Sequence, residues 1–600
     1  MTPSAPEPQR ELDPRLVLRG LPNHRPRSQR PTPRTVVSPS LILPVDGEVI
    51  DLRTAEELSR RPDLHPGPHR DQVPGVPGAM RPTGLVAVLR GSPAAQALHT
   101  TASALPLAVV LGIATFFRFW HLSEVGYNSD EAVYAGTAAS MAGHTDYSGM
   151  FPVFRAHPLM FQTFLSLLFR FGVSDWGGRA LAAAFGVAAV GVTYALGRRL
   201  YGPLCGAIAG LLLAVMPYHV IVSRQVLLDG PMTLFATVTL YCLVRYCEKA
   251  SWRWMLAAGG ALGVTVLSKE TSAILLGSIY AFFALTPAIR LRIRHLLAGA
   301  AVLVALFAVF PMVVRISGPT STRNSYLLWQ LGRRGNHPVL FYADIIPAAV
   351  GILTLVAALF GLIVLRRNLD SWRERLLLAW IAIPVTFFTL WPLKGYQYLL
   401  PIVPAVAVLA ARGLVALYWL PWLRVPGRLR LRRGTVIVAV LMATASLIPS
   451  TWALVNPSSS GTFLAGTGGV PGGREAGQWL QQNAPVNSQL LVIGPSMANI
   501  LQFYGHHRAF GLSVSSSPRD RNPAYQPVAN PDRWVRDGQV QYVVWDSYTA
   551  NRTPFFAAKI TALAERYHGV AVYTATVAVR TPGGERSRSP VVIIYQVRPA

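Results

Sequence analysis

Long apolar segments alternate with short polar turns over residues 101–455. Most of these segments approach the roughly 20 residues that a helix needs to cross a bilayer. The pattern predicts a mainly α, polytopic helical membrane domain. The eleven predicted spans are 103–120, 176–196, 203–222, 231–244, 254–267, 272–287, 296–314, 344–365, 376–390, 398–419 and 435–455.

One further apolar segment, 158–171, is only about 14 residues long and contains Arg170. If this segment does not cross the membrane, five basic turns all face one side, and they contain 17 Lys/Arg among 48 residues. The loops on the opposite side contain only 8 Lys/Arg among 102 residues. Basic loops stay in the cytoplasm. We therefore expect 158–171 to lie on the outer surface, the N-terminus to be cytoplasmic and the C-terminus to be extracytoplasmic at the plasma membrane.

The two ends of the chain differ from the membrane domain. Residues 1–100 contain 17 prolines among alternating charges, which predicts a disordered cytoplasmic tail. Residues 456–473 are rich in Gly and Ser and predict a linker. Residues 474–600 alternate four helical segments with four short strands, which predicts an extracytoplasmic α/β domain.

Composition agrees with a membrane protein. The chain is 51% hydrophobic and 14% charged, with a mean hydropathy of +0.35. The three cysteines lie in apolar segments and show no disulfide or metal-binding spacing. Only 4 of the 55 basic residues are lysines. We expect membrane lipid and no nucleic acid as partner.

The loop after the first span contains "GYNSDEAVYA", with Asp130 and Glu131 between aromatic residues. An acid here can act as a general base, or hold a metal or a sugar hydroxyl. Alternatively, Ser129, Asp130 and Glu131 cap a surface helix, because acids in the first turn favour the helix dipole.

Other polar residues lie on the same predicted face. His157 precedes Pro158 and can donate to a phosphate or serve as a structural interfacial histidine. Arg224 and Asp229 share one short external turn. Asp229 alone is also explained as an N-cap of the next span.

Two external turns contain lysine in a chain that otherwise favours arginine. Lys269 and Lys394 suit point contacts with phosphate oxygens. The alternatives are snorkelling, or a local pair of Lys269 with Glu270. Tyr396 and Tyr398 are further site candidates, or part of an interfacial aromatic belt.

Together these residues describe one outer site with acids for a hydroxyl nucleophile and cations for a phosphate leaving group. A glycosyl phosphate has a good leaving group already, so the protein must mainly orient the acceptor and stabilise the phosphate charge. Direct attack by the acceptor inverts the anomeric centre. No nucleotide cofactor is expected, and the need for a divalent metal stays open.

Six ordered segments, "YNSDEAVYA", "HPL", "GGRALAAAFGV", "SRQVLLDGP", "LGVTVLSKETSAILL" and "KGYQYLLPIVPAVAVLAARGL", resemble the GT-C class of membrane glycosyltransferases. The chain is most similar to the superfamily of dolichyl-phosphate-mannose-protein mannosyltransferases and aminoarabinose transferases. The resemblance covers about residues 105–420.

The resemblance implies a sugar donor on a polyprenyl phosphate and transfer of a hexose or pentose to a hydroxyl of protein, lipid or cell-envelope glycan. It implies that Asp130 is the catalytic base or orients the acceptor, with Glu131 beside it as a second catalytic candidate. It also implies donor-phosphate roles for Lys269, Lys394, Arg224 and His157, although relatives often have Lys at the position of His157. Where relatives often read Arg-Tyr, this chain has Gln397–Tyr398, so Lys394 is expected to supply the charge.

Three other functions compete with this interpretation. An oligosaccharyltransferase-like enzyme would share the first-loop acid and would need a bound metal and a fuller acceptor motif. A transporter would show internal repeats and charges at the membrane midplane. A scaffold for cell-envelope assembly would fold in the membrane without transferring sugar.

Overall fold

The computed structural model describes residues 93–153, 157–316, 335–365, 371–419, 429–456, 470–518, 520–580 and 586–599, and the isolated positions 329 and 332. All of these residues belong to the unit that begins at residue 84. The predicted tail, apart from 93–100, and most of the predicted linker lie outside the described residues.

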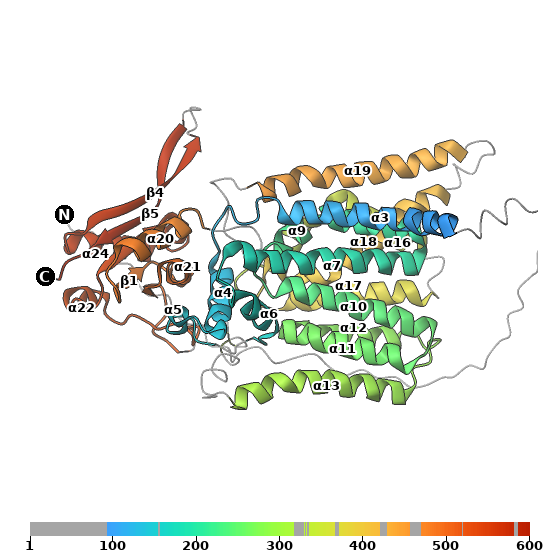
Figure 1. Cartoon of the computed structure of the whole chain (residues 1–600), viewed down its shortest axis with the longest axis horizontal. Helices are drawn as coiled ribbons and strands as arrows, with labels where there is room; N and C mark the ends of the chain where they lie inside the picture. Colours follow the sequence, from blue (N-terminus) through green and yellow to red (C-terminus); the bar gives the residue numbers. More distant parts are fainter. Residues whose placement is uncertain are drawn as a thin grey trace, which may run out of the picture. The chain divides into compact units, whose positions relative to one another are not determined.

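Long helices lie side by side in a bundle over residues 93–455 (Figure 1). The bundle contains α3 (Pro93–Phe119), α7 (Asp175–Tyr201), α8 (Pro203–Val215), α10 (Asp229–Glu248), α11 (Trp252–Ser268), α12 (Leu275–Ala284), α13 (Ile293–Ile316), α16 (Ile352–Leu365), α17 (Trp372–Leu390), α18 (Val403–Ala416) and α19 (Leu429–Val455). The other helical elements described in this region are α4 (Ser129–Ala142), α5 (Thr145–Ser148), α6 (Met160–Phe169), α9 (Pro217–Ser223), η2 (Glu270–Ile274), α15 (Phe341–Val350), η4 (Tyr396–Ile402) and η5 (Leu417–Trp419).

All eleven predicted apolar segments lie on these helices. By length and apolarity, four of the described helices can cross a membrane, and up to six if each bent pair is one span. The other segments lie on helices that are shorter or less apolar, so eleven spans stay a prediction. The bent pairs are α8 with α9, at 61°, and α15 with α16, at 99°. Gly351 makes the sharper bend with a φ of +92°, which a residue with a Cβ rarely adopts.

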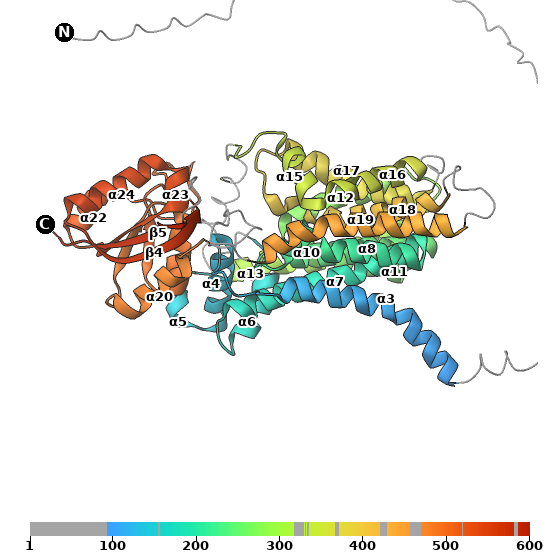
Figure 2. The same cartoon turned by 90° about the horizontal axis from the view of Figure 1, so that it is seen from above.

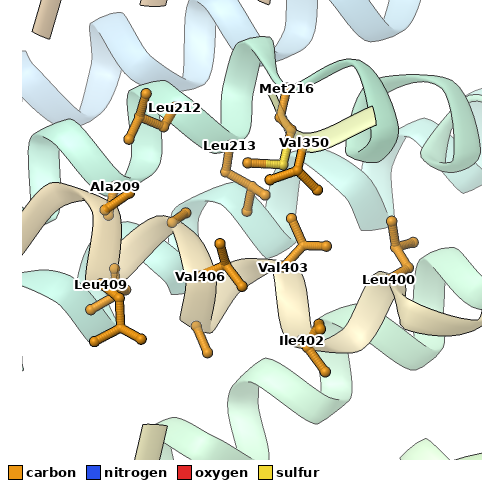
Figure 3. Close-up of a cluster of buried hydrophobic side chains, with 14 of the residues drawn as sticks. Ala209, Leu212, Leu213, Met216, Val350, Leu400, Ile402, Val403, Val406 and Leu409 are labelled. Carbon is orange, nitrogen blue, oxygen red and sulfur yellow. The ribbon is translucent and has the colours of Figure 1, made fainter. Parts of the chain in front are cut away.

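The apolar core lies between α8 and α18. Figure 3 shows Leu212 and Leu213 of α8 facing Val403 and Val406 of α18. Helix α16 approaches α18 closely at Gly413, where a Cβ would lie 2.0 Å from the Ala357 carbonyl oxygen. Small residues of this kind let apolar helices come together without a side chain between them.

Helix α6 is amphipathic in the predicted outer-surface segment. It buries Phe161, Leu165 and Phe169 and exposes Phe164 and Leu168. Its 10 residues are too few to cross a bilayer. An exposed aromatic and leucine face suits the lipid interface.

Residues 473–596 hold a five-stranded sheet in the order β2-β1-β3-β5-β4. Strand β1 is parallel to β2 and β3, and the contacts of β5 with β3 and β4 are antiparallel. The elements are α20 (Gly473–Asn483), β1 (Gln489–Val492), α21 (Pro495–Gly505), β2 (Arg508–Gly511), α22 (Pro531–Arg536), β3 (Tyr542–Asp546), α23 (Ser547–Arg552), α24 (Pro554–Arg566), β4 (Val570–Arg580) and β5 (Arg586–Gln596). The sequence did not predict β2 or α23.

The sheet domain contacts the loop after α3 through Tyr504 of α21. The Tyr127 N–H donates to the Tyr504 hydroxyl oxygen at 2.7 Å, and that hydroxyl donates to Asp175 Oδ2 at 2.7 Å. Arg474 of α20 adds hydrogen bonds of 2.7 Å to the carbonyls of Ser123 and Glu124. These contacts hold the domain against the loop that carries Asp130.

Tyr504→Phe should lower the free energy of unfolding by about 1–3 kcal/mol, because it leaves the Tyr127 N–H and the half-buried Asp175 carboxylate without this partner. Thermal unfolding in detergent or nanodiscs measures the change. Tyr280→Phe is the matched control, since Tyr280 is 77% exposed. Equal stability of Tyr504→Phe and the control would show that this contact does not hold the domain.

Candidate functional site

Helix α4 begins with a capping box that orients the two acids. The Glu131 N–H donates to Asn128 Oδ1 at 3.0 Å, and the Asn128 N–H donates to Glu131 Oε2 at 3.1 Å. The predicted alternative of a helix cap is therefore correct for Glu131. The capping residue is Asn128, however, and not Ser129. Asp130 lies in the first turn, where its carboxylate is free of the cap.

Glu131 is fully buried and its oxygens are shared among several donors. Arg179 of α7 donates from Nε to Oε1 at 2.8 Å and from Nη2 to Oε2 at 2.7 Å. The Val226 N–H donates to Oε1 at 3.0 Å. These bonds join α4, α7 and the turn before α10. Glu131 therefore holds these three segments together, and we propose this structural role in place of the catalytic role predicted from the sequence.

Asp130 is half-buried and lies among ionisable groups from three other segments. Burial raises the pKa of its carboxyl, Lys269 and His157 act to lower this pKa, and Asp229 and Glu131 act to raise it. A carboxylate with a raised pKa beside a cation is a good general base near neutral pH. The structure thus brings together four of the predicted site residues around Asp130.

Lys269 and Asp229 form a buried ion pair. Lys269 Nζ lies 2.9 Å from Asp229 Oδ1 and 3.0 Å from Oδ2. Nζ also lies 4.6 Å from the centroid of the Tyr398 ring, a cation–π contact. The predicted alternatives of an Asp229 N-cap and a Lys269–Glu270 pair are both wrong, because Leu228 occupies the cap position and Lys269 binds Asp229.

His157 binds the neighbouring Glu270. Its Nδ1 lies 2.9 Å from both carboxylate oxygens of Glu270, at the start of η2. The contact brings the segment before α6 to the end of α11. His157 therefore lies near the Lys269–Asp229 pair, and it acts to lower the pKa of the Asp130 carboxyl.

Lys394 lies in the turn between α17 and η4 and is buried. Its Nζ donates to the Trp391 carbonyl at 2.9 Å. Asn336 holds its backbone by accepting from the Lys394 N–H at 2.8 Å and donating to the Lys394 carbonyl at 2.9 Å. Two tyrosines of η4 follow: Tyr398 lies under Lys269, and Tyr396 packs edge-on against Tyr218, which donates to the Tyr396 carbonyl.

Arg224 is placed differently from the prediction. Its Nη1 donates to the Phe117 carbonyl at 2.7 Å and its Nη2 to the His121 carbonyl at 3.3 Å. Both acceptors lie at the end of α3. The guanidinium therefore holds α9 against α3, and we propose this anchoring role in place of the predicted phosphate contact.

A small apolar cavity adjoins the Lys269–Tyr398 contact. Tyr398 lines it together with Met232 of α10, Leu275 of α12 and Phe388 of α17. The described residues contain no group of three or more His, Cys, Asp or Glu side chains placed to hold a metal ion.

Part of this chain matches known proteins in sequence. The family described as Dolichyl-phosphate-mannose-protein mannosyltransferase matches residues 156–314. YkcB of Bacillus subtilis (strain 168), described as a candidate mannosyltransferase, is 28% identical over 156 residues, which are 26% of this chain and 22% of that protein. The match thus spans about a fifth of the length of this curated relative.

Two solved structures show the same fold over most of the chain. ArnT from Cupriavidus metallidurans, bound to undecaprenyl phosphate, has a TM-score of 0.60 at 18% identity and covers 82% of this chain and 98% of its own. The archaeal oligosaccharyltransferase AglB from Archaeoglobus fulgidus was solved in complex with an inhibitory peptide and a dolichol-phosphate. It has a TM-score of 0.51 at 14% identity, and the match covers 82% of this chain and 74% of the AglB chain. The resemblance to GT-C membrane glycosyltransferases that use polyprenyl-phosphate sugars is confirmed.

Proposed function

We propose that this chain is an integral membrane glycosyltransferase that moves a sugar from a polyprenyl-phosphate donor to a hydroxyl acceptor on the extracytoplasmic face. The proposal rests on one observation: half-buried Asp130 lies near the buried Lys269–Asp229 ion pair. The lipid phosphates bound to ArnT and AglB support a lipid-phosphate donor.

In the proposed reaction the acceptor oxygen attacks the anomeric carbon of the donor. Asp130 takes the proton of the acceptor hydroxyl, the bond between the anomeric carbon and the phosphate oxygen breaks, and polyprenyl phosphate leaves. A single displacement of this kind inverts the anomeric centre. The new charge on the phosphate is stabilised by Lys269 and Lys394, which are held in place before the reaction.

The surrounding residues hold these groups in position. Asp229 directs the Lys269 ammonium, and the Tyr398 ring lies against it. Glu270 orients the His157 ring beside Asp130.

Lys269→Gln should raise the KM for the polyprenyl-phosphate sugar about tenfold or more, because a charge-assisted contact to phosphate is replaced by a neutral one. Glutamine can still donate a hydrogen bond to Asp229, so the fold is expected to persist. Initial rates against donor concentration measure the effect.

The matched control for Lys269 is Lys559→Gln, since Lys559 lies on α24 against Phe555. A folded Lys269→Gln protein with wild-type donor dependence would remove Lys269 from the phosphate site.

The rate should also fall in acid, because protonated Asp130 cannot accept a proton. Burial raises the pKa of Asp130, so kcat/KM should be lost at a higher pH than for an ordinary carboxylate as the pH falls through this pKa. Asp229→Asn removes a negative charge that raises the Asp130 pKa, so it should move the acid limb to lower pH. A pH profile of kcat/KM for the two proteins measures this shift, and an acid limb that stays in place or moves to higher pH would contradict the role of Asp130 as base.

A further inference from the structure

We infer that helix α23 of the sheet domain completes the site, with Arg552 as a further cation for the donor phosphate and Tyr548 as its positioning residue. The inference rests on the proposed function, because it assigns these residues to the same donor. It gives the sheet domain, whose role the sequence left open, a part in binding the donor.

Helix α23 is held firmly at its start by Asp546. This residue ends β3, which lies between β1 and β5. Its buried carboxylate accepts from the Thr549 N–H at 2.7 Å, which caps α23. Thr549 in turn packs closely on Gly494, where a Cβ would lie 2.8 Å from Thr549 Cγ2. The helix is therefore placed by the middle of the sheet and not by a free loop.

The sheet domain places α23 near Asp130. Asn499 of α21 donates to Ser129 Oγ at 2.9 Å, one residue before Asp130. Tyr548 packs against the apolar cluster that α4 shares with the sheet domain. Burial raises the pKa of the Tyr548 phenol to about 12, and the charge of Asp130 contributes to the rise. Figure 2 shows α23 on the side of the domain that faces the helical bundle.

Arg552 lies at the end of α23, on the Tyr548 ring. Its guanidinium lies 4.6 Å from the centroid of that ring, and the side chain is exposed. His337 follows Asn336, which holds the Lys394 backbone. Burial lowers the pKa of His337, and the charges of both Arg552 and Lys394 lower it further. Cations of the sheet domain and of the helical bundle thus act on the same imidazole.

Two cations that approach the same group repel each other, and an anion between them removes the repulsion. The phosphate group of the donor is such an anion, and its negative charge is largest in the product, polyprenyl phosphate. An exposed arginine can bind it through two parallel N–H donors. Tyr548 holds the guanidinium by a cation–π contact. Because this contact already restricts the Arg552 side chain, phosphate binding costs less conformational entropy.

The test measures binding of undecaprenyl phosphate and of the uncharged undecaprenol to the full-length protein in nanodiscs. Arg552→Gln should weaken binding of the phosphate about tenfold and leave binding of the alcohol unchanged. Arg552→Lys should recover part of the loss. Arg566→Gln, an exposed arginine of α24 paired with Asp532, is the matched control and should bind as wild type.

The outcomes separate this inference from the proposed function. Wild-type protein that does not prefer the phosphate over the alcohol would refute the proposed donor, and this inference with it. A preference that survives Arg552→Gln would refute the role of Arg552 alone.

Discussion

Asp130→Asn should lower kcat by about 10²- to 10⁴-fold, the usual contribution of a positioned general base. Asparagine has nearly the same shape but cannot take the proton of the acceptor hydroxyl. Asp130 is not part of the capping box, so α4 should still form in the variant. Initial rates at saturating donor and acceptor measure the loss, and thermal unfolding checks that the variant is folded.

Asp146→Asn is the matched control for this substitution. Asp146 lies on α5 in the same external loop, is 70% exposed and pairs with His506 at the surface. It should transfer sugar at the wild-type rate. A folded Asp130→Asn protein that transfers as fast as this control would show that the base is another group.

Glu131→Ala should lower the free energy of unfolding by about 3–5 kcal/mol, because it leaves the buried Arg179 guanidinium without its charge partner. The change also removes the acceptor for the Val226 N–H and one half of the capping box. We therefore expect loss of fold and of activity together. Thermal unfolding in nanodiscs, followed for the bundle and the sheet domain, measures the effect.

The control for Glu131 is Glu248→Ala, because Glu248 pairs with the partly exposed Arg199. A solvent-exposed pair contributes only about 0–1 kcal/mol. Glu131→Ala with wild-type stability and reduced kcat would restore Glu131 to the catalytic role that the sequence suggested.

The acid cluster and the lysines could be recognised as site candidates from the sequence. Lys269 stands out because almost every other basic residue is arginine, and it lies beside Asp130 as expected. The loop acids stand out because they follow an apolar span. In both cases the signal is a residue type that is unusual in its surroundings, which a single sequence can show.

Pairing between helices was harder to predict. Arg179 was visible as a charge in an apolar helix, which needs a partner. Its pairing with Glu131, like that of Lys269 with Asp229, depends on how α4, α7, α10 and α11 pack, and the sequence does not show this. From the residues alone, Asp130 and Glu131 could not be told apart, and only the family resemblance favoured Asp130.

The contacts of Arg224 could not be predicted from the side of the membrane on which it lies. The positive-inside rule assigns a residue to one face of the membrane, and Arg224 shares the predicted face of Asp130. It does not say toward which helix a side chain points. The 61° bend after α8 decides that, and it directs Arg224 to the carbonyls at the end of α3.

The central claim is that sugar leaves a polyprenyl phosphate at the site around Asp130. Its most direct test is to incubate the purified protein with a panel of labelled polyprenyl-phosphate hexoses and pentoses in the presence of cell-envelope acceptors. We expect one donor to lose a single labelled sugar to a covalent acceptor with wild type, and Asp130→Asn to retain the label on the lipid. Label that remains on every lipid with wild type, or that moves across the bilayer without forming a new covalent bond, would contradict it.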